Sequence, residues 1–131
     1  MKVDIKHRND IILLLDRFYQ EALFDETLKP IFTKIIGDNI QDHMPIMYNF
    51  WSSILIREQS YTGNVMLKHI AIHKQMPLDK EHFEQWIHLW DKTVNELFKG
   101  PVADEAKKRA SLMKELMLFK IGKSSEQGFI Q

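Results

Sequence analysis

Hydrophobic residues recur along most of this chain at the spacing of about 3.6 residues that gathers them on one face of an α-helix. No segment of useful length alternates between apolar and polar residues as a half-buried strand does. The pattern therefore predicts an all-α protein. Helices are expected over about 10–23, 28–36, 43–56, 65–74, 80–98 and 102–121.

Capping residues suggest where these helices begin. Asn9 and Asp10 are expected to cap the first helix, and Asp42 the third, which would leave Pro45 in a first turn whose amides lack intrahelical partners. Asp79 is expected to cap the long helix that follows Pro77. The sequence thus predicts helices with short, polar connections.

The length of 131 residues suits a single domain, 1–131, with its core over about 10–121. Residues 122–131 are polar and lack periodicity, so they are expected to form a flexible tail. The amino terminus is charged and the apolar run at 11–15 is too short for a signal peptide or a membrane span. These features predict a cytoplasmic protein.

Charge and cysteine content narrow the possible functions. The 18 basic and 18 acidic residues cancel without forming blocks, so neither nucleic acid nor an acidic membrane surface is an expected partner. There is no cysteine, which removes disulfides, zinc–thiolate sites, iron–sulfur clusters and thiol nucleophiles. Metal chemistry must then use histidine or carboxylate.

Four polar residues lie within otherwise apolar helical patterns: Tyr19, His43, His69 and Trp86. A buried polar group without a partner costs about 1–3 kcal/mol, so each needs a hydrogen bond or a metal. A haem pocket would explain all four, with His69 as a neutral imidazole ligand of iron. Taken singly, however, each is more often an ordinary core or surface residue. His73 forms an HxxxH pair with His69, but no glutamate completes a zinc-protease motif.

The third helix carries one face of interest, because His43, Met47, Phe50 and Ile54 fall at i, i+4, i+7 and i+11. Aromatic and methionine stripes of this kind are more often core than cofactor wall. No nucleophile elbow, phosphate-binding loop, dinucleotide fingerprint or EF-hand loop is present. From the residues alone, the chain is an all-helical domain with unexplained histidines.

Five motifs occur in a characteristic order and spacing: FYQEAL at 18–23, LKPIF at 28–32, HMPIMYNFW at 43–51, YTGNVMLKH at 61–69 and HFEQWIHLW at 82–90. Together they resemble a group III truncated haemoglobin over about residues 10–115. The resemblance implies a globin-like two-over-two helical sandwich and haem b (iron protoporphyrin IX) as cofactor.

The resemblance also implies roles for individual residues. His69 would be the proximal iron ligand, with His73 as the fallback, and Phe32 would stack on the porphyrin. Tyr19 and Trp86 match the family's distal hydrogen-bond donors, and His43 matches its distal histidine. The role implied for Met47 and Phe50 is to line the distal side of the pocket.

By the same resemblance, the expected ligands are dioxygen and nitric oxide. The expected role is redox or detoxification chemistry, such as nitric oxide dioxygenation or peroxidase-like turnover. Because the chain has no flavin or nicotinamide motif, an enzyme of this kind would need a separate reductase. A haem-based carrier or sensor and a non-haem helical binding module are the alternatives, and the protein is expected to be a monomer or to associate weakly.

Overall fold

A computed structural model describes residues 2–35, 40–57 and 78–126 of the chain. This part forms the helices α1 (Arg8–Ala22), α2 (Lys29–Ile35), α3 (Ile40–Leu55), α5 (Lys80–Leu97) and α6 (Pro101–Glu126). Within it the only β-type pairing is an isolated bridge between Val3 and Phe98. The prediction of an all-α class is confirmed, while the helix expected over 65–74 lies outside the described residues.

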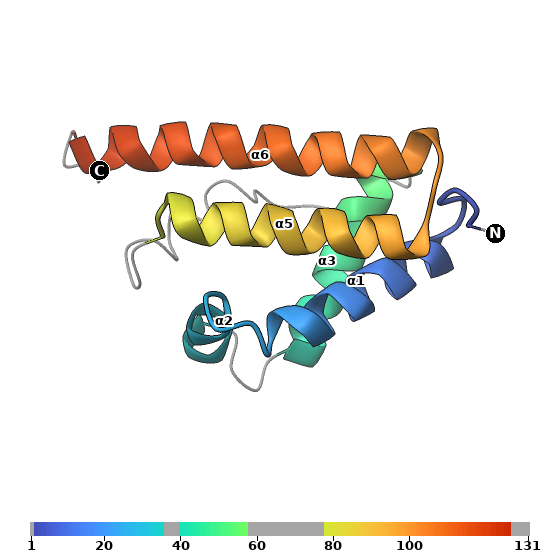
Figure 1. Cartoon of the computed structure of the whole chain (residues 1–131), viewed down its shortest axis with the longest axis horizontal. Coiled ribbons are helices and arrows are strands. Elements are labelled where there is room, and N and C mark those ends of the chain that lie inside the picture. Colours follow the sequence, from blue (N-terminus) through green and yellow to red (C-terminus); the bar gives the residue numbers. More distant parts are fainter. Residues whose placement is uncertain (1, 36–39, 58–77, 127–131) are drawn as a thin grey trace.

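The helices form two layers of two (Figure 1). In one layer α5 and α6 lie side by side and run in opposite directions, and in the other α1 lies below α5 in this view while α3 crosses behind α1 and α5. The most extensive packing joins α5 with α6, α1 with α5, and α1 with α3. This arrangement is the predicted two-over-two sandwich, with α2 placed at one end of it.

The start of α5 follows the prediction. The Asp79 side chain accepts a hydrogen bond from the backbone N–H of His82 at 3.2 Å, as an N-cap does. Leu78 and Phe83, which flank the cap, are both buried in one apolar cluster. The pair forms a hydrophobic staple that fixes the angle at which the chain enters the helix.

The other two predicted caps are wrong. Helix α1 begins at Arg8 with His7 as its N-cap, and the Asp10 carboxylate accepts from the backbone N–H groups of Lys6 and His7 at 2.8 and 3.0 Å. Helix α3 begins at Ile40, so Pro45 lies inside it and one intrahelical hydrogen bond is not formed. In both cases the expected capping residue lies within the helix, because the helix begins one or two residues before it.

The end of the last helix also differs from the expectation. Pro101 occupies the first position of α6, where its missing N–H has no cost, and the helix continues to Glu126 instead of ending near 121. Residues 122–126, expected to belong to a flexible tail, are therefore helical. The segment 127–131 lies outside the described residues.

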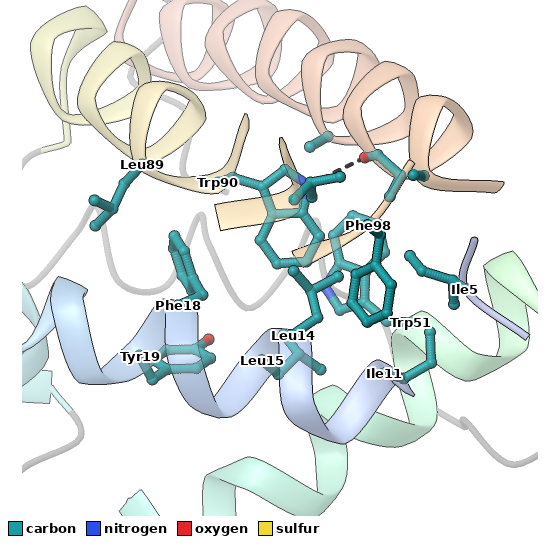
Figure 2. Packing of buried hydrophobic residues seen from close by; sticks show 14 of the residues in the cluster. Ile5, Ile11, Leu14, Leu15, Phe18, Tyr19, Trp51, Leu89, Trp90 and Phe98 are labelled. Atoms are coloured by element: carbon teal, nitrogen blue, oxygen red, sulfur yellow. Dashed lines mark hydrogen bonds between the residues drawn. The ribbon is translucent and has the colours of Figure 1, made fainter. Parts of the chain in front are cut away.

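Trp90 is the centre of the core (Figure 2). Its ring stacks on Trp51 of α3 with centroids 4.5 Å apart and meets the edge of Phe18 of α1 at 5.3 Å. Its indole N–H donates to the backbone carbonyl of Ala106 in α6 at 3.1 Å. One fully buried side chain of α5 therefore contacts the three other long helices.

The amino-terminal segment is fixed to the start of α6 by Asp4. The backbone N–H groups of Val102 and Ala103 donate to the Asp4 carboxylate at 3.0 and 2.8 Å. Gly100 precedes this turn with φ +147°, and a Cβ there would lie 2.5 Å from the Asp4 Cγ. Only glycine allows this backbone conformation and so close an approach.

We expect Asp4→Ala to lower the free energy of unfolding by about 1 kcal/mol at neutral pH, because α6 loses its capping carboxylate. Burial raises the pKa of Asp4, but the hydrogen bonds from Val102, Ala103 and Ile5 outweigh it and hold this pKa below its ordinary value. A lowered folded-state pKa means that the stabilisation is present above about pH 4 and is lost as the pH falls through the folded pKa. Urea unfolding followed by circular dichroism at neutral and acidic pH measures both effects.

Asp104→Ala is the matched control, since Asp104 lies on the same turn with its side chain 77% exposed. It should change stability by less than Asp4→Ala. If Asp4→Ala lowers the free energy of unfolding by the same amount at neutral and at acidic pH, the capping role of the Asp4 carboxylate is contradicted.

Candidate functional site

Tyr19 lies in the last turn of α1, at the junction of α1, α2 and α3. Its side chain is buried, and its ring meets the edges of Phe32 and His43 at centroid distances of 5.4 and 5.5 Å. Three residues that are far apart in the sequence therefore converge on one point. All three are among the predicted site residues.

The Tyr19 hydroxyl oxygen lies 3.0 Å from Nε2 of His43, so the two side chains share a hydrogen bond. Tyrosine can donate one proton, whereas a neutral imidazole nitrogen either donates or accepts according to its tautomer. A His43 that carries its proton on Nε2 donates to the Tyr19 oxygen and leaves the Tyr19 proton for another acceptor. The pair can therefore present a hydroxyl donor toward a third group.

Burial keeps this donor protonated. Removal from water disfavours the phenolate form and raises the pKa of Tyr19 far above its ordinary value. The hydroxyl is therefore a neutral donor across the whole physiological pH range. A neutral donor in an apolar setting suits an acceptor with partial negative charge.

Phe32 is held in place through the turn between α1 and α2. The Asp25 carboxylate accepts from the backbone N–H groups of Thr27 and Leu28 at 3.0 and 3.1 Å, which shapes the start of α2. The amide of Gln85 on α5 donates to the other Asp25 oxygen at 2.6 Å. These bonds join α2 to α5 and explain why the short helix has a defined position beside Tyr19.

Helix α3 has two different faces. Trp51, Ser52 and Leu55 are buried, and Trp51 and Leu55 belong to the same core cluster as the buried residues of α1. The predicted stripe lies on a different face of the helix and is half-buried. We call this face the α3 ligand face, and it consists of His43, Met47, Phe50 and Ile54. It runs about 16 Å along the helix at 1.5 Å per residue.

A cavity of about 320 Å³ lies at the far end of the α3 ligand face from the Tyr19–His43 pair. Its walls come from α3 and α6 and are almost entirely apolar: Phe50, Ile54, Arg109, Leu112, Met113, Leu116 and Met117. One predicted site residue, Phe50, is thus a wall of the cavity. The α3 ligand face joins this cavity to the hydrogen-bonding pair.

Trp86 lies between the two ends of this region. It packs against the main core cluster, which contains Tyr19, and also against the smaller cluster that contains Met117. Its side chain is half-buried, and its indole N–H donates no hydrogen bond to any residue in the described part of the chain. Trp86 therefore adds a donor that no described residue uses to the donor that the Tyr19–His43 pair can present.

The structure brings together Tyr19, Phe32 and His43, and it places Met47, Phe50 and Trp86 around the same region. His69 and His73 lie outside the described residues. Sequence reasoning missed Met113 and Met117 as cavity walls, since both fall on the expected packing stripe of the last helix. The content of seven methionines was the available signal, because methionine suits adaptable cavities.

The two helical layers have a globin-like, two-over-two arrangement, and comparison with known proteins supports this fold. A crystal structure of group III truncated haemoglobin from Campylobacter jejuni has the same fold, with a TM-score of 0.84 and 26% identity over 92% of this chain and 95% of that one. A curated group 3 truncated haemoglobin of Campylobacter jejuni is 28% identical over 128 residues, which cover 93% of this chain and 98% of the relative. No protein-family profile matches the chain. The resemblance to group III truncated haemoglobins is confirmed in both sequence and fold.

The burial of Tyr19 predicts a specific alkaline titration. Because burial raises its folded-state pKa, Tyr19 should remain protonated in the native protein at about pH 11, where an exposed tyrosine is ionised. Tyr19→Phe should therefore leave the native phenolate absorbance at that pH unchanged, but should remove one of three tyrosine signals after unfolding. A loss of native phenolate absorbance in the variant would mean that the Tyr19 hydroxyl is exposed to water.

Proposed function

We propose that this protein binds haem against the α3 ligand face and uses Tyr19, Trp86 and His43 to act on a small ligand at the iron. The observation that carries the proposal is one helix face with a half-buried histidine bonded to a buried tyrosine at one end and a mostly apolar cavity of about 320 Å³ at the other. A flat, largely apolar macrocycle needs such a surface. The names of the similar proteins point to the same cofactor.

The residues present fit the group. Phe32, Met47 and Phe50 supply aromatic and thioether contacts that suit a porphyrin, and the α3 ligand face is comparable to a porphyrin in length. Within residues 2–35, 40–57 and 78–126, no group of three or more His, Cys, Asp or Glu side chains is arranged around a metal. A haem iron needs only one protein ligand, because the porphyrin supplies four nitrogens. His69 is our proposal for that ligand.

When bound, haem b would supply an iron that takes dioxygen or nitric oxide. The task of the chain is to hold donors toward a ligand that gains partial negative charge. The Tyr19 hydroxyl and the Trp86 indole N–H can both donate, and each is fixed by packing before a ligand arrives. Donors that are already oriented bind such a ligand tightly and slow its release.

Slow release favours chemistry over transport, since a carrier must give up its ligand. The proposed overall reaction joins one dioxygen and one nitric oxide with one electron to form one nitrate ion. A separate reductase would supply the electron. In the described part of the chain no helix is long and apolar enough to span a bilayer, and we propose a cytoplasmic site of action for this reaction.

Absorbance of the purified protein after addition of haem tests the cofactor. A strong porphyrin band with one equivalent of haem is the expected result, and His69→Ala should abolish the five-coordinate ferrous spectrum. His73→Ala is the matched control, four residues away, and should retain that spectrum. If His73→Ala abolishes the five-coordinate ferrous spectrum and His69→Ala retains it, the iron ligand is His73. If haem produces no porphyrin band at all, the chain is a non-haem helical module.

Release of dioxygen from the ferrous protein tests the donors. We expect Tyr19→Phe and Trp86→Phe each to speed release about ten- to a hundredfold, as expected from losing a hydrogen bond to a charged acceptor worth about 1.5–3 kcal/mol. Tyr48→Phe should leave the rate unchanged, because the Tyr48 hydroxyl donates to Asp16 on α1 instead. Stopped-flow mixing of the oxygenated protein with nitric oxide then measures turnover, and slow consumption of nitric oxide would favour a carrier or sensor.

A further inference from the structure

The surface of α6 carries a row of exposed apolar residues, and two of them, Leu112 and Leu116, also line the cavity. Leu112, Leu116 and Phe119 are 56, 49 and 62% exposed, and their spacing of four and three residues places them on one helix face. We call these three residues the α6 stripe. Exposed apolar residues that lie together, rather than singly, mark a surface for interaction.

Charged residues border the α6 stripe in a regular way. Lys108 and Glu115 are seven residues apart and lie along one side, while Glu105 continues the line of the stripe and Lys120 lies along the other side. In each of the pairs Lys108–Glu115 and Glu105–Lys120, the two charges are opposite and are separated along the helix. Arg109, which bonds Glu105 at 2.7 Å, and Lys114, which lies 3.4 Å from Glu115, add cations beside the two carboxylates.

We propose that two copies of this chain associate through their α6 stripes, antiparallel, about a two-fold axis that passes beside Leu112. Such an axis reverses the helix direction but keeps each side of the stripe facing the same side of the other copy. Lys108 lies four residues before Leu112 and Glu115 three residues after it, so Lys108 of one copy lies opposite Glu115 of the other. Lys120 lies eight residues after Leu112 and Glu105 seven before it, so Lys120 of one copy lies near Glu105 of the other.

This arrangement favours a second copy over an unrelated partner. The charge pattern is complementary to itself, and the symmetry forms each of the two ion pairs twice. Leu112 packs on its own counterpart at the axis, and Leu116 lies over the aliphatic stems of Lys108 and Arg109. A single helix face is smaller than the roughly 800 Å² per partner of a standard interface, so the dimer should be weak and concentration-dependent.

The association has a consequence for the cavity. Leu112, Leu116 and Arg109 belong both to the proposed interface and to the cavity walls. The second copy therefore covers the side of the cavity that a single chain exposes to water. If haem occupies this region, which rests on the proposed function, dimer formation should slow its loss.

Sedimentation velocity of the purified protein over a range of concentrations tests the dimer. The sedimentation coefficient should rise with concentration, and Leu112→Arg should abolish the rise because it places two like charges at the axis. Leu13→Arg is the matched control, since Leu13 is a leucine of similar exposure, 47%, on α1. It should behave as the original chain does.

Charge reversal tests the register. Lys108→Glu and Glu115→Lys should each raise the dimer dissociation constant about fivefold or more by creating like-charge contacts, and the double variant should restore it. A chain that stays monomeric up to a concentration of about 1 mM overturns the proposal. Dimerisation that survives Leu112→Arg, or a double variant without restoration, also overturns it.

Transfer of haem to an excess of an apo-globin acceptor tests the link to the cavity. Haem loss should be faster for Leu112→Arg than for Leu13→Arg. For the original chain, haem loss should become slower as the protein concentration rises. Equal rates of haem loss for both variants and at all protein concentrations would refute the proposal that the second copy covers the cavity. Failure of the proposed function would instead appear as no haem uptake by any variant, while sedimentation of the apo-protein still decides the dimer.

Discussion

The structure depends on how one tryptophan joins the two helical layers. Trp90 of α5 is buried, stacks on Trp51 of α3 and meets the edge of Phe18 of α1. Its indole N–H, the only hydrogen-bond donor of the side chain, donates to the Ala106 carbonyl of α6. A large aromatic ring can pack against several helices at once, and the buried indole N–H needs one hydrogen-bond acceptor, which a backbone carbonyl supplies. Alanines at 103, 106 and 110 let α6 approach closely enough for that bond. With the layers fixed in this way, the α3 ligand face stays only half-buried along its length.

That half-buried face is where the candidate chemistry lies. Trp51, Ser52 and Leu55 are buried on one side of α3, whereas His43 and Met47 are only half-buried, and under the proposed function they contact the bound cofactor. The half-buried state of this face follows from the two-layer geometry, because two helices per layer cannot enclose every side of α3. Under the proposed function, a cofactor bound along this face covers it and is held by the packed helices.

Burial also sets the chemistry of the site. The Tyr19 hydroxyl lies in an apolar region, so burial raises its pKa and it stays protonated. It also keeps its hydrogen bond to Nε2 of His43. Trp86 adds a donor that no described residue uses. Both donors lie among apolar side chains, whose low polarity strengthens a hydrogen bond to a partly negative ligand. At the opposite end, the cavity stays partly open along Leu112 and Leu116, and the same residues form the surface proposed to meet a second copy.

The sequence by itself determined the all-α class, the apolar faces of α1, α5 and α6, and the cap and staple at Asp79, because these follow from local spacing and local hydrogen bonds. Motif order supplied the family resemblance. Only the tertiary structure decided that Tyr19 and His43, 24 residues apart, share a hydrogen bond, because that contact depends on the angle at which α1 crosses α3. It also decided which face of α3 packs, where α1 and α3 begin, and that Met113 and Met117 line a cavity. Helical spacing places residues on a face, but what lies opposite that face is set by packing between helices.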